Sequence, residues 1–238
     1  MTWYRHWLEL RWRLPLFALV ALLLGAWRPG RGMNGAADFS HTGRMYKALQ
    51  ETVLAQSIGT EDLFIWAAFT ERIWILAWLS AFLFVGNGLR TALLPRDLSI
   101  YYMLGLPVSR GRLIWTRHAA NLIAGILLLA MTWGVHCVVL WFQGRAVPFV
   151  PMAQSAAFTI LILVAWIAVM AALSAVMYEI WAFLATLPLF IITQRPAWDL
   201  VTAFLARGEF PWTPAAALLA IAALSFAFML HAESAREF

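Results

Sequence analysis

The sequence predicts an all-α integral membrane protein, and two observations support this fold class. Hydrophobic residues make up 63% of the 238 residues and charged residues only 12%, against roughly 45–50% and about 25% in soluble domains. Apolar segments recur along the whole chain, so no stretch is long and polar enough to form a separate soluble domain. We therefore expect residues 1–238 to form a single membrane domain.

Six apolar segments approach the length of about 20 residues that a helix needs to cross roughly 30 Å of hydrocarbon. The first and fifth are short, and the fifth contains Pro188 and is followed by "RPAWDLVTAFLARGEFPWTP". These features predict a break, with one or two short interfacial or re-entrant helices before Pro211. The expected spans are residues 13–28, 66–89, 113–142, 154–177, 179–194 and 212–231.

The residues before the first span predict an amphipathic elbow helix that lies in the membrane interface. On a helical wheel, Trp3, Trp7, Leu10 and Leu14 share one face, whereas Arg5, Glu9 and Arg13 share another. A cleaved signal peptide ending at Gly25-Ala26 is the alternative, since a basic start precedes an apolar run. Three tryptophans before the run argue against a signal peptide. The elbow helix also adds length to the short first span.

Basic residues predict the orientation of the spans. The loop from Leu89 to Arg117 carries five arginines and the N-terminus carries three, whereas residues 146–153 carry no Lys or Arg. Short loops rich in Lys and Arg stay in the cytoplasm, so both termini are expected there. The long 28–62 loop, with four basic residues, weakens this bias. Tryptophans should then mark the outer interface at Trp27, Trp66, Trp141, Trp198 and Trp212, and the inner one at Trp115.

Local signals refine three of the spans. Thr60 can cap the helix that becomes the second span, with Glu61 and Asp62 in its first turn, where the helix dipole favours negative charge. Small residues recur along the fourth and sixth spans and predict a tight bundle or a dimer seam. These residues are Ala165, Ala168, Ala172 and Ala175 in the fourth span and Ala216, Ala220 and Ala223 in the sixth.

Several kinds of chemistry are excluded or disfavoured by the sequence. Lys47 is the only lysine and lies in "GRMYKAL", which lacks the glycine spacing of a phosphate-binding loop, and HExxH, CxxC and GxSxG do not occur. We expect no cofactor on this chain. Its basic residues stand at segment ends and do not form a patch, which disfavours nucleic-acid binding. Cys137, the single cysteine, is expected to serve packing alone.

A few ionisable residues within spans are candidates for a substrate pathway. Glu71 and Arg72 form the most prominent pair, because charged side chains in lipid are costly and usually functional. The alternative is that they lie just outside the hydrocarbon on an extended helix. His118 and His136 share one face of the third span but lie roughly 27 Å apart at 1.5 Å per residue, too far for one metal ion. His136 either contributes to the pathway or is a polar residue that lines the bundle.

A polar insert, "LLPRDLSIYYMLGLPVSRGRLIW", separates the second and third spans. Pro95 suits the first turn of a short helix, Asp97 favours its N-terminus, and Gly105 followed by Pro107 would end it. This helix presents aromatic and methionine side chains, which are enriched at protein interfaces. The alternative is a helix that lies on lipid.

The insert and its surroundings resemble the type-2 ABC transporter permeases. The likeness comprises an elbow helix, six spans, a cytoplasmic helix between the second and third spans, and "LGLPVSRGRLIWTRH" leading into the third span. In this family, two membrane subunits pair with two separate ATPase subunits, and the cytoplasmic helix docks in the ATPase as a coupling helix. The broken segment between the fifth and sixth spans also matches, whereas the 28–62 outer loop is long for a small member.

The resemblance implies a role for each part of the insert. A partner ATPase, which would bind ATP and Mg²⁺, would be contacted by Arg96, Asp97, Leu98, Tyr101, Tyr102, Met103 and Gly105. The hinge into the third span would consist of Pro107, Ser109, Arg110 and Arg112. Further expected partners are a second permease copy or a paralogue, and membrane lipid. The resemblance also implies a bacterial inner membrane and an amphipathic or hydrophobic substrate for export.

Two other classes of function stay open from the sequence. One is a structural membrane subunit of a larger complex, which needs no passage between halves. The other is an intramembrane enzyme using Glu71, His136 or Glu179, which requires at least two ionisable groups at one depth. The sequence scatters these groups, and Glu179 stands where the fourth span turns into the fifth.

Overall fold

The structure, a computed structural model, describes six helices. Residues described are 13–26, 60–85, 110–145, 147, 149–177, 181–193 and 209–234, and they contain no strand. The helices are α2 (Arg13–Gly25), α5 (Thr60–Val85), α8 (Arg110–Phe142), α9 (Phe149–Ser174), the helix Trp181–Thr193, and α11 (Trp212–Ser234). The predicted elbow helix and insert, apart from the start of α8, lie outside the described residues.

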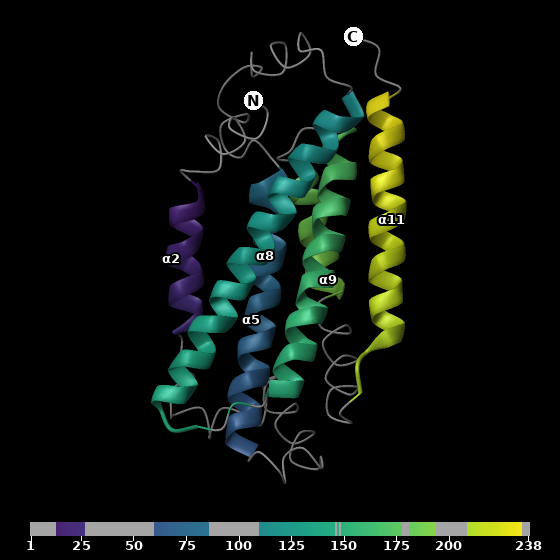
Figure 1. Cartoon of the computed structure of the whole chain (residues 1–238). Helices are drawn as coiled ribbons and strands as arrows, with labels where there is room; N and C mark the ends of the chain where they lie inside the picture. Colours follow the sequence, from purple (N-terminus) through teal and green to yellow (C-terminus); the bar gives the residue numbers. More distant parts are fainter. Residues whose placement is uncertain are drawn as a thin grey trace.

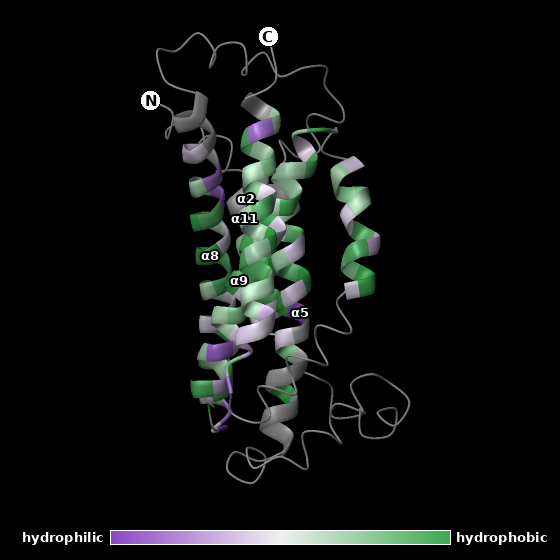
Figure 2. Ribbon diagram, turned by 90° about the vertical axis from the view of Figure 1, so that its right-hand side faces the viewer, coloured by the Kyte–Doolittle hydropathy of each residue, from purple (hydrophilic) through white to green (hydrophobic). Residues whose placement is uncertain are grey.

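Three of these helices are long and apolar enough to cross a membrane. The segments are His118–Phe142, Phe149–Ser174 and Trp212–Ala232, with 25, 26 and 21 residues, against the roughly 20 that a span needs. Hydrophobic residues colour the helices green along most of their length (Figure 2). The chain is therefore a helical membrane protein. That α2, α5 and the helix Trp181–Thr193 also cross stays a prediction.

The helix boundaries agree with the predicted spans to within a few residues. α8 and α11 end close to the predicted limits, whereas α5 and α9 begin at Thr60 and Phe149, about one turn or more before the limits at 66 and 154. Pro151 does not prevent the early start of α9, because N–H groups in a first turn have no partner within the helix. Pro188 lies inside the helix Trp181–Thr193 without interrupting it, so there is no break at this proline.

A Schellman motif ends α8 and turns the chain toward α9. The amide of Arg145 donates to the Leu140 carbonyl at 3.1 Å, and that of Gly144 donates to the Trp141 carbonyl at 2.9 Å. Gly144 has a φ of 66°, the left-handed conformation in which glycine pays no penalty for a side chain. The turn lets α9 run back along α8 in the opposite direction (Figure 1).

α9 lies at the centre of the bundle. It packs against α5, α8 and α11, whereas α2 packs mainly on α8 (Figure 1). The burial of the helices agrees with this arrangement. Among the three long apolar helices, α9 is the most buried and α11 the least. The four alanines predicted to allow close packing in the fourth span are all buried, three on α9 and one directly after it, in agreement with the bundle interpretation. They are Ala165, Ala168, Ala172 and Ala175.

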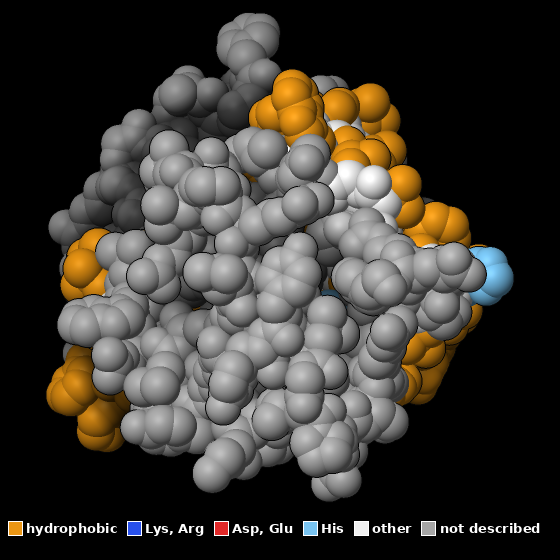
Figure 3. Space-filling view, turned by 90° about the horizontal axis from the view of Figure 1, so that it is seen from above, with side chains coloured by type: hydrophobic (Ala, Val, Ile, Leu, Met, Phe, Trp, Pro, Cys, Tyr) orange, Lys and Arg blue, Asp and Glu red, His pale blue; other side chains and the backbone are white. Residues whose placement is uncertain are grey.

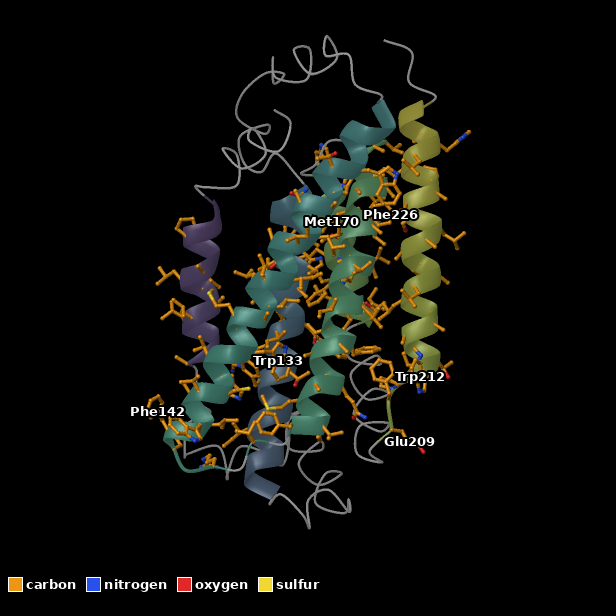
Figure 4. All side chains as sticks on the ribbon, in the orientation of Figure 1. Trp133, Phe142, Met170, Glu209, Trp212 and Phe226 are labelled. Carbon is orange, nitrogen blue, oxygen red and sulfur yellow. The ribbon has the colours of Figure 1, made fainter. Side chains whose placement is uncertain are left out.

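Large apolar side chains cover the outside of the bundle. Leu127, Leu219 and Leu224 are 64%, 52% and 71% exposed on α8 and α11, and the described side chains visible around one end are almost all hydrophobic (Figure 3). Such a surface suits lipid contact. Phe142 and Trp212 lie at the lower end of the bundle in Figure 4. The exposed Trp115, in the second turn of α8, lies at the opposite end, as predicted for two tryptophan belts.

Candidate functional site

All of the predicted ATPase-docking residues lie outside the described residues. This applies to all positions from Arg96 to Gly105, and to Pro107 and Ser109 of the predicted hinge. Arg110 and Arg112 form part of the first turn of α8, which begins at Arg110. The hinge motif therefore continues directly into a helix of 33 residues.

Arg72 and His136 occupy different environments. Arg72 lies on α5 with an exposed side chain, whereas His136 on α8 is 1% exposed. The side chain of Glu71 lies outside the part of the chain that the structure describes. The structure does not bring Arg72 and His136 together as one ionisable pair. It places Arg72 on the surface of the bundle and His136 in its interior.

His136 connects three helices. Its Nδ1 lies 3.2 Å from the Gly25 carbonyl at the end of α2, and its ring stacks on Phe69 of α5 with centroids 3.6 Å apart and planes 6° apart. A carbonyl only accepts hydrogen bonds, so Nδ1 carries the proton in this contact. Nε2 of a neutral imidazole then presents a lone pair, and it is buried without a hydrogen-bond partner in the described part of the chain.

The contact with His136 depends on the absence of a side chain at Gly25. A Cβ added there would lie 2.9 Å from the Thr132 carbonyl oxygen and 2.9 Å from Val135 Cβ. Glycine lets the last turn of α2 approach the backbone of α8 closely enough to place its carbonyl at His136. A helix end leaves its last carbonyls without intrahelical donors, and the histidine supplies a donor from another helix.

Trp133 lies one turn before His136 and belongs to the same site. Its ring meets Phe69 edge-to-face, with centroids 4.9 Å apart and planes at 85°. Trp133 is 7% exposed, and its Nε1–H is also buried without a described partner. Figure 4 places Trp133 in the lower part of the bundle. Phe69 therefore contacts two aromatic rings that each carry an unsatisfied nitrogen.

A second aromatic cluster fixes the helix Trp181–Thr193 against α5 and α9. The Trp78 ring stacks with Phe183 and with Phe190, at centroid distances of 4.9 and 4.7 Å. Trp78 Nε1 donates to Thr186 Oγ1 at 3.4 Å, and Thr186 Oγ1 donates to the Phe183 carbonyl at 2.8 Å and lies 3.6 Å from Met170 Sδ. This cluster is satisfied internally, which identifies it as structural.

His118 belongs to a third contact, between α8 and α11. It is buried and meets Phe226 edge-to-face with centroids 6.0 Å apart, and Trp115 stacks on the same Phe226 at 5.9 Å. The two histidines of α8 thus contact different helices near different ends of the bundle. Among the described residues there is no group of three or more His, Cys, Asp or Glu that could hold a metal ion.

Several of these residues were not singled out as site residues from the sequence. Trp133 was not selected, because interfacial anchoring accounts for most tryptophans in such a chain. The spacing of Trp133 and His136, three residues apart, contains the signal that both lie on one helix face. Phe69 and Gly25 contact them only through tertiary packing, and no local pattern predicts that.

Comparison with known proteins identifies no relative of the chain. No protein-family model matches it, and no curated protein and no solved structure matches it. The expected resemblance to type-2 ABC permeases therefore rests on the sequence alone.

Proposed function

We propose that the chain is the membrane-spanning subunit of an ATP-driven exporter of the type-2 ABC permease class. It would move an amphipathic or hydrophobic substrate across the plasma membrane of a bacterium. A separate ATPase subunit would bind ATP and Mg²⁺, and a second copy or a paralogue would supply the other half of the passage. This rests on three helices long and apolar enough to cross a membrane and on the sequence resemblance.

The start of α8 is the observation that carries this proposal. The helix begins at Arg110, inside "LGLPVSRGRLIWTRH", and continues without interruption to Phe142. In the permease family such a motif connects the coupling helix to the third span. A rigid helix that starts at the motif would transmit movement of the insert to the core, because Leu128 and Leu129 of α8 are buried there.

The remaining architecture supports the same proposal. A described helix coincides with each of the six predicted spans, and α5, α8, α9 and the helix Trp181–Thr193 share one packed core. The elbow helix, the six crossings and the cytoplasmic termini are parts of the proposal. Of the predicted pathway residues, His136 is the better placed for contact with a substrate between helices, whereas exposed Arg72 suits an interface with lipid or another subunit.

Co-purification tests the proposal. A tagged chain extracted from its native membrane in mild detergent should bring down an ATPase of the ABC class, and the complex should hydrolyse ATP. A stable complex that contains no ATPase would support the structural-subunit alternative and contradict the permease assignment.

A further inference from the structure

Two buried polar atoms of the bundle, His136 Nε2 and Trp133 Nε1 on α8, have no described hydrogen-bond partner. Native structures pair the great majority of buried polar groups with protein or with an ordered ligand or water. Two unsatisfied nitrogens one turn apart, both against Phe69, therefore require an explanation.

His136 and Trp133 lie one turn apart on α8 and contact the same ring of α5. The His136 ring stacks on Phe69 at a centroid distance of 3.6 Å, and the Trp133 ring meets Phe69 edge-to-face at 4.9 Å. Both nitrogens therefore belong to one aromatic contact between α8 and α5.

The hydrogen-bonding roles of the two nitrogens indicate which chemical group can bind between them. Nε2 accepts a hydrogen bond, since Nδ1 donates to the Gly25 carbonyl, and the indole Nε1–H of Trp133 only donates. A hydroxyl satisfies both atoms at once, because it has one O–H donor and two acceptor lone pairs. The groups that point to the ligand are uncharged and lie among the rings of Phe69 and Trp133. A charged ligand would pay a large desolvation cost there.

We propose that His136 Nε2 and Trp133 Nε1 form a hydroxyl-binding site inside the bundle. The bound O–H donates to Nε2, its oxygen accepts from Nε1, and the Phe69 ring lies against both partners. Two sources supply this chemistry: a water molecule held between the helices, or the hydroxyl group of an amphipathic alcohol that enters between them. The second source rests on the proposed export function, and it makes the substrate a neutral, hydroxyl-bearing amphiphile.

Nitrogen NMR of the full chain in lipid nanodiscs tests the site directly. Side-chain ¹⁵N labels in His and Trp report whether Nε2 of His136 accepts a hydrogen bond and whether the Trp133 N–H has an acceptor. His136→Gln and Trp133→Phe assign the two signals by their loss, and Trp133→Phe keeps an aromatic ring against Phe69. Spectra are compared without additive, with 1-octanol, and with 1-methoxyheptane, an isomer that has no O–H.

Each outcome decides the proposal. A hydrogen-bonded Nε2 without additive, with a Trp133 N–H that exchanges in D₂O, identifies water as the ligand. A shift of Nε2 that 1-octanol causes and 1-methoxyheptane does not identifies an amphiphile hydroxyl. Trp133→Phe should then weaken 1-octanol binding about fivefold, the equivalent of one neutral hydrogen bond. Trp78→Phe, whose N–H bonds Thr186 instead, should leave the binding unchanged.

An Nε2 that stays without a hydrogen bond under all three conditions overturns the site. Equal responses to the alcohol and the ether overturn it as well, because recognition would not involve the O–H. The measurement needs no ATPase, so a failure to co-purify one would contradict the proposed function and leave the hydroxyl site standing. If an ATPase co-purifies but Nε2 of His136 has no hydrogen bond, the proposed function stands and the hydroxyl site is contradicted.

Discussion

At the scale of single residues, Gly25 makes a close backbone contact between α2 and α8 that a substitution can test. Replacing it with Ala would place a Cβ 2.9 Å from the Thr132 carbonyl oxygen, a backbone atom that cannot rotate away. We expect Gly25→Ala to push α2 from α8 and to lower the free energy of unfolding by about 1–3 kcal/mol, the usual cost of overpacking. Thermal unfolding in detergent measures the loss.

Two further glycines, both on α8, provide matched controls. A Cβ at Gly134 meets nothing within 4 Å, so Gly134→Ala should be neutral or stabilising by less than about 1 kcal/mol, from helix propensity. A Cβ at Gly125 meets mainly the end of the Leu163 side chain, which can move, so its cost should be intermediate. Equal effects at all three positions would contradict the explanation by close helix approach.

The residue scale also shows the limit of sequence-based prediction. The pattern singled out His136 as a polar group within a span, and the structure confirms that it lies inside the bundle. Its partners Gly25 and Phe69 are 111 and 67 residues away. Helical periodicity predicts which side of α8 is buried, but contacts between distant segments depend on how all the helices pack.

At the scale of elements, Thr186 joins the helix Trp181–Thr193 to the bundle. Thr186→Val keeps the side-chain volume but removes the acceptor of the buried Trp78 N–H. We expect it to cost about 1–2 kcal/mol of unfolding free energy, because a buried donor is left unpaired. Hydrogen exchange followed by mass spectrometry should show faster exchange in this helix. Thr193→Val, whose hydroxyl bonds its own helix at Leu189, should leave both quantities unchanged.

Two neighbouring alanines test how α11 is positioned. Ala222 is 5% exposed on the side of α11 that packs against α9, whereas Ala223 is exposed. Ala222→Leu should destabilise the chain by about 1–3 kcal/mol through overpacking, while Ala223→Leu should change the stability by less than about 0.5 kcal/mol. Unfolding midpoints in detergent compare them. A large loss of stability for Ala223→Leu in the monomer would contradict the observed face of α11.

The prediction made for small residues has different outcomes on α9 and on α11. The alanines of α9 are buried as a tight bundle requires, but Ala216, Ala220 and Ala223 of α11 are exposed in the single chain. A spacing of small residues indicates that close approach is possible, without saying which partner approaches. For α9 the partners belong to this chain, and for α11 a dimer seam stays a prediction.

Element boundaries were predictable where a local signal exists and less so elsewhere. α5 begins at Thr60, where Glu61 and Asp62 favour a helix start, although the apolar criterion placed the span six residues later. The helix Trp181–Thr193 retains Pro188 because that residue lies on an exposed side. A proline costs one hydrogen bond, and packing through Trp78 and Met170 offsets it.

At the scale of the whole molecule, composition alone predicted the fold class, because so many apolar residues have no other stable environment. The three long apolar helices confirm it. The arrangement with α9 at the centre and α2 on α8 was not predictable, since association in lipid depends on detailed shape and on buried polar groups more than on hydrophobicity. The proposed function depends on the insert before α8, so it is tested there.

Charge reversal in the insert tests the proposed coupling at the level of the complex. Arg96→Glu, and separately Ala at both Tyr101 and Tyr102, should reduce the ATPase recovered with the tagged chain at least several-fold, while the amount of inserted chain stays constant. Arg145→Glu is the matched control, because Arg145 follows the far end of α8 from Arg110 and should not affect recovery. Quantitative immunoblotting of both subunits measures the ratio. Unchanged recovery for the insert variants would place the insert against lipid and remove the mechanical link from ATPase to α8.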